Sequence, residues 1–154
     1  MTFTDEQIQD IYDARDYETC LSMVTESLKF KPEHVHNTIL QASCWTRLDT
    51  NLDEAVEALK EIVERFPSNV FANYQLGYTL YCASRISESL GQLYKVVELD
   101  PPRDRIFQKT LEFIRKCESI SAAVTNGKNF VADTKEFSQK LCTQHCSVEK
   151  LRQK

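Results

Sequence analysis

Glycine and proline are scarce in this chain, which has three glycines and four prolines among 154 residues. An all-β sandwich or barrel needs a turn about every 8–12 residues and relies on these two residue types to make them, so the composition disfavours that class. Three glycines are also too few for a glycine-rich loop that cradles phosphate. The sequence therefore favours an all-α fold about one domain long.

Long apolar runs are absent too. No stretch approaches the roughly 20 apolar residues that span a bilayer, and the opening MTFTDEQIQD is polar and acidic, unlike a secretory signal. Disulfides are rare in reducing compartments, so we expect the six cysteines to remain free thiols. These features predict a cytoplasmic protein without a membrane partner, and the nucleus is the second expected location.

No set of side chains indicates catalysis or a metal site. Cys142, His145 and Cys146 lie within about one helical turn, but a structural zinc site takes four ligands and no further pair has a suitable spacing. His34 and His36 lie together without other candidate ligands. No Ser/His/Asp or Cys/His combination can be assembled for a stated reason. We therefore expect a non-catalytic protein with no cofactor and no metal.

An internal repeat marked by proline is the strongest positive feature. Pro32, Pro67 and Pro101 each follow a helix-like run (SLKFKP, EIVERFP and VVELDP), and they are 35 and 34 residues apart. Residues 36–69 laid over residues 70–103 place small residues on small ones and apolar residues on apolar ones, at helical spacing. Each proline is expected to end a helix, because it lacks an N–H group and its ring clashes with the preceding turn.

Small residues occupy the two places where the helices of one unit would cross. In the third unit they are Gly77 and Ser89, and larger side chains there would push the two backbones apart. Glycine costs about 1 kcal/mol of helix propensity relative to alanine. Its presence inside a helical pattern is best explained by close packing of two helices.

These units resemble the tetratricopeptide repeat family. The third unit matches best, through Leu76, Gly77, Leu80, Tyr81, Ser89, Leu93, Val96 and Leu99-Asp100-Pro101. The second unit matches well, through Ala42, Ala55, Leu59, Ile62 and Pro67. The resemblance implies an all-α fold, a right-handed superhelix of stacked antiparallel helical hairpins that ends in a C-terminal capping helix.

The resemblance also implies how the chain is divided. We expect repeats at about 1–35, 36–69 and 70–103, a partial repeat at 104–126, and a capping helix or tail at 127–154. The partial repeat should hold one clear helix, DRIFQKTLEFIRKCES, and a second helix around residues 120–125 that is cut short by Asn126-Gly127. In the tail, apolar residues recur on one helical face, which is typical of a helix that covers the end of an array. Docking onto a second protein is the alternative for this segment.

The first helix of each repeat is expected to line a concave wall, and positions between its core residues are free to contact a ligand. The aligned units put aromatic side chains in the middle of this wall and cations at its C-terminal end. The same alignment also places Leu40, Cys44 and Arg47 there. Packing against the next repeat is the alternative for any one tyrosine. The candidate peptide-binding residues are Asn37, Gln41, Phe71, Tyr74, Gln75, Tyr78, Arg105 and Lys109.

Charge is distributed unevenly along the chain. Residues 1–99 hold 8 Lys and Arg against 16 Asp and Glu, whereas residues 100–154 hold 11 against 7, which divides the net charge of −4 into −8 and +4. A basic end on an acidic protein indicates an anionic partner, and a solvated lysine-rich helix is the alternative. The overall acidity disfavours nucleic acid as that partner, since phosphate binding normally needs a basic domain.

Family members that serve heat-shock chaperones hold the chaperone's C-terminal carboxylate in a clamp. The final basic pair of that clamp has counterparts in Arg105 and Lys109. Gln75 stands where asparagine is expected, and Asn37 and Gln41 stand where lysine and asparagine are expected. The missing lysine removes a charge-assisted hydrogen bond worth about 1.5–3 kcal/mol. An acidic chaperone tail is thus one candidate partner, through the basic pair alone.

Taken together, the residues and the resemblance predict a non-catalytic protein–protein interaction module. It would bind a peptide or a partner helix in its concave groove and act as an adaptor or co-chaperone. The alternative is a structural subunit of a larger assembly, which would dock through its convex face or its C-terminal helix.

Overall fold

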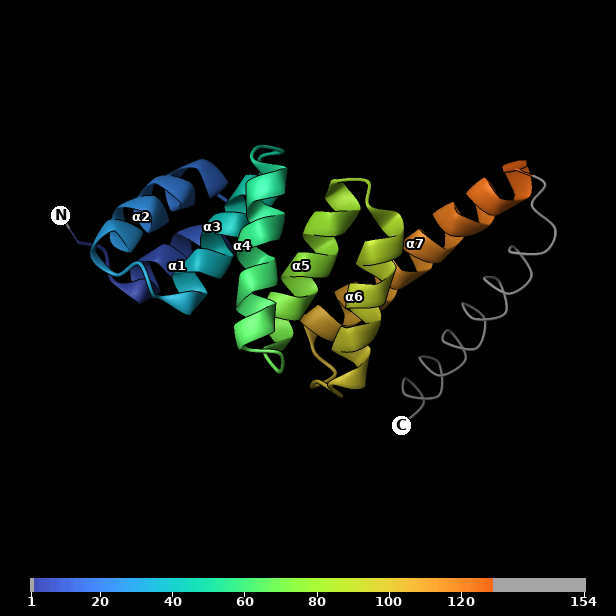
Figure 1. Cartoon of the computed structure of the whole chain (residues 1–154). Helices are drawn as coiled ribbons and strands as arrows, with labels where there is room; N and C mark the ends of the chain where they lie inside the picture. Colours follow the sequence, from blue (N-terminus) through green and yellow to red (C-terminus); the bar gives the residue numbers. More distant parts are fainter. Residues whose placement is uncertain (1, 129–154) are drawn as a thin grey trace.

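The computed structural model describes residues 2–128, which form seven α-helices and no strand. Figure 1 shows the helices side by side in a row, with α4 and α6 passing in front of their neighbours. Three hairpins and a longer helix follow one another: α1 (Asp5–Asp13) with α2 (Tyr17–Phe30), α3 (Val35–Arg47) with α4 (Leu52–Arg65), α5 (Val70–Cys82) with α6 (Ile86–Glu98), and then α7 (Arg105–Lys128).

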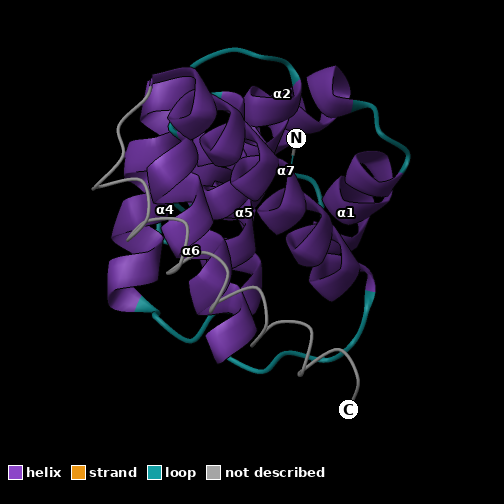
Figure 2. Ribbon diagram, turned by 90° about the vertical axis from the view of Figure 1, so that its right-hand side faces the viewer, coloured by secondary structure: helices purple, strands orange, loops and turns teal. Residues whose placement is uncertain are grey.

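Each helix packs against the next one along the chain, and the first helices of successive repeats also touch, α3 against α5 and α5 against α7. Figure 2 gives the end-on view, in which α1 and α7 lie on the side away from α4 and α6. Helices α3, α5 and α7 therefore form one wall of the array. This arrangement confirms the predicted all-α fold of stacked antiparallel hairpins.

The close crossing predicted for the third hairpin is present. A Cβ atom added to Gly77 would lie 2.6 Å from the Cδ2 atom of Leu93 on α6, so a larger residue would force the Leu93 side chain to move. The hydroxyl of Ser89, which is fully buried, donates a 2.6 Å hydrogen bond to the Gly77 carbonyl oxygen. Small side chains at both places thus let the helices touch and let a buried polar group be satisfied.

Two hydroxyl pairs, one part-buried and one buried, join the first helices of neighbouring hairpins. Tyr12 on α1 and Ser43 on α3 are hydrogen-bonded at 2.6 Å, and Thr46 on α3 and Thr79 on α5 are hydrogen-bonded at 2.8 Å. Directional bonds of this kind fix the rotation of one hairpin relative to the next, because a buried partner left unpaired costs about 1–3 kcal/mol. The wall is therefore held in one shape.

The turn inside each hairpin has a left-handed residue at the same place, and the second hairpin has another at Asn51, with φ 48°. Arg15, Asp49 and Ser84 have φ values of 64°, 55° and 62°, in the region that side chains other than glycine adopt at a cost. This conformation reverses the chain between the two helices. In the first hairpin the left-handed residue is Arg15 itself, so the turn conformation also sets the position of the Arg15 Cα and Cβ atoms.

The partial fourth repeat differs from the prediction. A second helix around residues 120–125 is wrong, because α7 runs unbroken from Arg105 to Lys128. No glycine or proline lies between Glu118 and Thr125, and the pair Ala122-Ala123 strongly favours helix. The helix therefore continues where a hairpin turn was expected. The predicted capping helix of the tail lies outside the described residues, and so do Cys142, His145 and Cys146.

Candidate functional site

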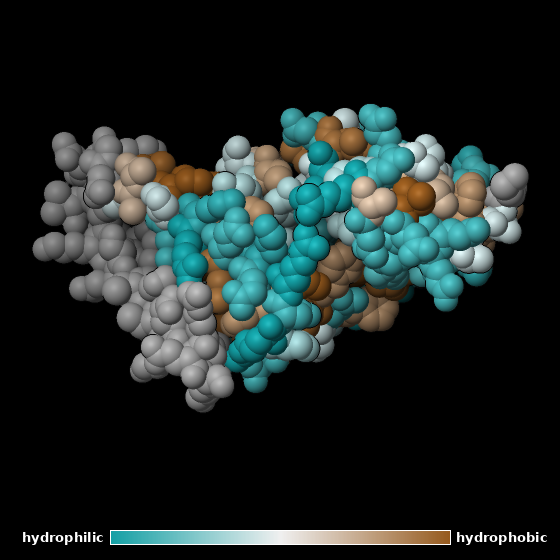
Figure 3. All heavy atoms as spheres, turned by 180° about the vertical axis from the view of Figure 1, so that it is seen from behind, coloured by the Kyte–Doolittle hydropathy of each residue, from teal (hydrophilic) through white to brown (hydrophobic). Residues whose placement is uncertain are grey.

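A cleft of about 690 Å³ opens on the wall formed by the first helices. Its lining comes from α1 and the turn after it, from the first residue of α2, from α3, and from the starts of α5 and α7, so all three hairpins and α7 contribute. Seen from behind, hydrophilic side chains cover much of the middle of the molecule, with apolar side chains showing in the hollows between them (Figure 3). The lining residues are Gln9, Tyr12, Asp13, Arg15, Tyr17, Val35, His36, Ile39, Arg47, Asn69, Phe71, Tyr74, Arg105, Ile106 and Lys109.

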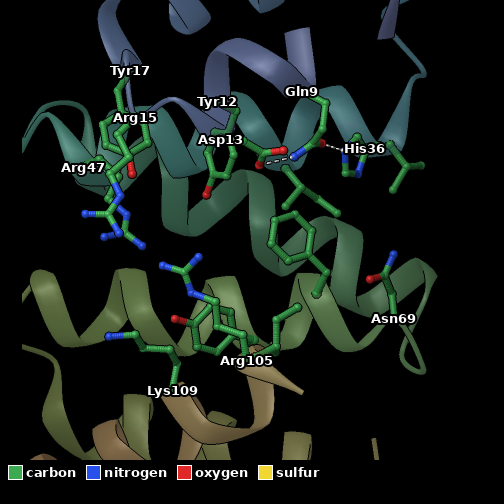
Figure 4. Close-up of a pocket in the computed structure, with 15 residues that line it drawn as sticks. Gln9, Tyr12, Asp13, Arg15, Tyr17, His36, Arg47, Asn69, Arg105 and Lys109 are labelled. Carbon is green, nitrogen blue, oxygen red and sulfur yellow. Dashed lines mark hydrogen bonds between the residues drawn. The ribbon is translucent and has the colours of Figure 1, made fainter. Parts of the chain in front are cut away.

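Four cations gather at one end of this cleft. Arg15 and Arg47 lie on one rim, Arg105 and Lys109 lie on the other, and their nitrogen ends face a shared space (Figure 4). They come from the first hairpin, the second hairpin and α7. We call these four residues the cationic cluster.

The cationic cluster has little negative charge around it. Within residues 2–128, the guanidinium groups of Arg15, Arg47 and Arg105 make no ion pair and no hydrogen bond. Lys109 pairs with Glu112 at 3.3 Å, but Glu112 also holds Lys116 at 3.0 Å. Among residues 2–128, Asp13 is the one carboxylate that lines the cleft, and its Oδ1 atom accepts a 2.9 Å hydrogen bond from Gln9.

Arg47 is held in place by aromatic rings rather than by a carboxylate. Its guanidinium carbon lies 4.7 Å from the ring centroid of Tyr78 and 5.7 Å from that of Tyr17. Stacking of this kind engages the face of the guanidinium group and leaves its N–H edges free to donate. Arg47 is therefore positioned before any ligand arrives.

Two of the tyrosines near Arg47, Tyr74 and Tyr78, remain neutral. Burial raises the pKa of Tyr74 to about 12, and the nearby charges of Arg47 and Arg105 only partly oppose this. Burial also raises the pKa of Tyr78 to about 12. Both phenols are therefore protonated at neutral pH, and the Tyr74 hydroxyl, which lines the cleft, can act as a hydrogen-bond donor.

The other end of the cleft is uncharged. The ring centroids of His36 and Phe71 lie 5.9 Å apart, and His36 shares a 2.9 Å hydrogen bond with Gln9. Burial lowers the pKa of His36, with the nearby His34 adding to the effect, so the imidazole is neutral at pH 7. The side chains of Val35, Ile39, Phe71, Ile106 and His36 make up what we call the apolar end.

The structure brings four of the eight predicted site residues together. Phe71, Tyr74, Arg105 and Lys109 all line the cleft. Tyr78 lies just behind the lining, under Arg47, with its ring centroid 5.0 Å from that of Phe113 on α7. Tyr78 thus packs against the next helix, which was the alternative expected for a single tyrosine.

The three predicted amides lie elsewhere. Asn37 is fully buried and donates to the Ser27 hydroxyl on α2 at 3.2 Å, and Gln41 donates to Thr25 on the same helix at 3.2 Å. Gln75 is 1% exposed and donates to Thr79 at 3.4 Å. The expectation that these positions are free for a ligand is wrong for Asn37 and Gln75, because they pack between helices.

Leu40 and Cys44, which the alignment also placed on the wall, are buried in the core of the first two hairpins. Their helix, α3, packs against α2 as well as α4. Positions on a first helix are therefore covered by the second helix of the preceding repeat. Arg47 lies at the end of α3 and is not covered by α2.

Several cleft residues were not predicted from the sequence. Gln9, Tyr12 and Arg15 belong to the first repeat, whose loose match to the family gave no groove positions. A signal for Arg15 does exist in hindsight, because it occupies the same turn position as Asp49 and Ser84. His36 precedes the aligned groove positions, and its role depends on contact with α1.

Among residues 2–128, no helix is both long and apolar enough to cross a membrane. In the same part of the chain, no cluster of three or more His, Cys, Asp or Glu side chains has a geometry suited to a metal ion. The described cysteines, Cys20, Cys44, Cys82 and Cys117, are free.

The fold and the cleft define a helical-repeat protein with a hollowed wall. Two solved structures of MamA from Desulfovibrio magneticus RS-1 share this fold. MamA 41-end has a TM-score of 0.65 at 16% identity and covers 96% of this chain and 73% of that one. The ArsTM double mutant has a TM-score of 0.66 at 16% identity, with 96% and 72% covered.

The repeats are tetratricopeptide-like, as the sequence resemblance predicted. The mouse (Mus musculus) interferon-induced protein with tetratricopeptide repeats 2 is 25% identical over 114 residues, which is 73% of this chain. The match spans only 24% of that protein. No family model matches the chain.

Proposed function

We propose that the chain is a non-catalytic adaptor that holds an extended segment of a partner protein in the cleft. Support comes from one observation above all. The cationic cluster has three guanidinium groups without an ion pair in residues 2–128, and it shares a cleft with the apolar end. Arginine and aromatic residues dominate the binding energy of many protein interfaces, and both are concentrated here.

The partner segment is acidic where it meets the cationic cluster and apolar where it meets Phe71 and Ile106. Both kinds of contact are available at once, because the two ends belong to one cleft. The net charge of −4 keeps the rest of the surface from attracting polyanions unselectively. The four free cysteines fit a reducing compartment, so the proposal places the protein in the cytoplasm or nucleus.

The proposal does not extend to a chaperone tail or to a co-chaperone role. Of the residues compared with the family's carboxylate clamp, only Arg105 and Lys109 line the cleft. Asn37 and Gln75 are buried between helices. Of the five positions that correspond to the clamp, three therefore lie outside the cleft, so a tail recognised by the full clamp would lack those contacts.

The test is capture of partners from cell lysate by the full chain, followed by mass spectrometry. The double variant Arg47→Glu/Arg105→Glu should lose at least one partner that the wild type retains, because it turns two attractions into repulsions. The matched control is Arg65→Glu, an exposed arginine on α4 outside the cleft. Capture that survives the double variant, with folding unchanged by circular dichroism, would reject the proposal.

A second candidate function rests on a groove of about 900 Å³ between α4 and α6. Leu76, Leu80 and Gly91 line it, and a Cβ atom added to Gly91 would have no atom within 4 Å, so the groove is open there. A larger assembly docking through the convex face would use this surface. Gly91→Arg should then abolish incorporation into that assembly and leave capture through the cleft unchanged.

A further inference from the structure

The cationic cluster concentrates its charge at one place rather than along the wall. Four cations from three parts of the fold face one space, while the other end of the same cleft carries none (Figure 4). A run of Asp and Glu side chains would be matched by cations distributed along a groove. This arrangement instead suits one compact, highly charged group.

We propose that this group is a phosphate monoester on a serine or threonine of the partner segment, an inference that rests on the proposed function. A phosphorylated side chain carries about −1.5 to −2 charge at neutral pH and three acceptor oxygens. A carboxylate carries one charge and two oxygens. Against four cations, with Asp13 the one lining carboxylate, the phosphate compensates more of the charge.

The donor geometry also favours phosphate. Arg15, Arg47 and Arg105 present planar guanidinium forks that make no ion pair or hydrogen bond within residues 2–128, and such forks bind phosphate through two parallel hydrogen bonds. The protonated hydroxyl of Tyr74 lies within the influence of both Arg47 and Arg105 and adds a neutral donor. Arginine suits such paired bonds better than lysine does.

The apolar end selects the type of side chain that the partner carries next to its phosphorylated residue. Ile106 follows Arg105 directly in α7, and Phe71 lines the same cleft. A partner that places its phosphate on the cationic cluster therefore has a neighbouring side chain over Phe71 and Ile106. The recognised segment thus combines a phosphoserine or phosphothreonine with a bulky apolar residue close to it.

The experiment uses three fluorescent peptide libraries that differ only at a fixed central residue, which is phosphoserine, glutamate or serine, with all flanking positions randomised. Fluorescence anisotropy with the full chain at physiological salt should give at least about tenfold tighter binding of the phosphoserine library than of the glutamate library. Selected phosphopeptides should be enriched in Leu, Ile or Phe near the centre.

Variants connect this preference to the cationic cluster. Arg105→Gln, an exposed position that leaves the core intact, should weaken phosphopeptide binding about tenfold or more. Arg105→Lys keeps the charge and loses the fork, so it should recover only part of that loss. Arg65→Gln, outside the cleft, should change nothing.

Equal binding of the glutamate and phosphoserine libraries would overturn the inference and leave an acidic-peptide adaptor standing. Binding of no library would overturn it too, and lysate capture would then decide the proposed function separately. Phosphopeptide binding that Arg105→Gln does not reduce would place the phosphate elsewhere. Tighter binding of a 5′-phosphorylated single-stranded oligonucleotide than of any phosphopeptide would replace the peptide with nucleic acid.

Discussion

The two ends of the cleft are built in different ways. At the apolar end, His36 shares a hydrogen bond with Gln9 and lies beside the ring of Phe71. At the cationic end, three arginines face a common space with no carboxylate paired to them in residues 2–128. One end is satisfied by its own contacts, whereas the other carries charge that only a ligand or solvent can balance. The difference makes the cationic end the stronger contributor to ligand affinity, whereas the apolar end supplies the weaker, uncharged contact.

Charge reversal at the cationic end should have the largest effect. Arg47→Glu/Arg105→Glu is expected to weaken binding of an anionic peptide at least about 100-fold, because each lost charge-assisted contact is worth about 1.5–3 kcal/mol. Anisotropy at two salt concentrations provides the measurement. The wild-type affinity should fall as salt rises, and the salt dependence should largely disappear in the variant. An unchanged salt dependence would mean that the charge acts elsewhere.

Truncation at the apolar end should have a moderate effect. Phe71→Ala is expected to weaken binding of the same peptide about tenfold, because it removes apolar contact. The salt dependence of binding should stay as in the wild type, since no charge is altered. Phe66→Ala is the matched control, because Phe66 is 41% exposed at the end of α4 and outside the cleft. A loss of salt dependence in Phe71→Ala would mean that the two ends do not act separately.

Acidification should affect the apolar end through His36. Its folded-state pKa is lowered by burial, so below the ordinary histidine pKa of about 6.5 the unfolded chain binds the proton more readily. The stability associated with a neutral His36 is present above that pH and is lost as the pH falls towards and through the folded-state value. Thermal melts at pH 7.5 and pH 5 should show a smaller drop for His36→Asn than for the wild type. Identical drops would contradict this.

Substitutions at the left-handed turn residues should have the smallest effect. They should also separate the contribution of the Arg15 charge from that of the backbone conformation. Arg15→Gly and Ser84→Gly both relieve a positive φ, and each should raise the free energy of unfolding by up to about 1 kcal/mol. Only Arg15→Gly should weaken anionic peptide binding. Arg15→Gln should weaken binding without stabilising the fold. Urea titrations and anisotropy on the three variants test this, and weaker binding by Ser84→Gly would contradict it.

The fold could be predicted because prolines and small residues recur in the sequence with the period of the repeat. Gly77 and Ser89 require a close crossing whatever surrounds them, so the hairpin follows from local chemistry. The continuation of α7 could not be predicted in the same way. The Asn-Gly pair looked like a stop, but the alanine-containing turn before it favours helix more strongly than the pair opposes it.

The site was predictable only in part, because burial depends on neighbours that a single repeat does not contain. Asn37 and Gln41 point towards α2 of the preceding hairpin, and a pattern within α3 cannot reveal that cover. Arg105 and Lys109 could be predicted because the aligned repeats place them at groove positions on the first helix of the partial fourth repeat. Arg15 was missed because its position follows from a turn conformation rather than from a helical face.

The hydroxyl pairs between hairpins have a consequence for evolution of the cleft. The residues of the cationic cluster come from the first hairpin, the second hairpin and α7. The distance across the cluster therefore depends on how each hairpin is rotated relative to the next. Thr46 and Thr79 set one of those rotations from inside the core. A substitution of Thr46 or Thr79 would therefore change which partners fit the cleft without altering any residue that contacts the partner.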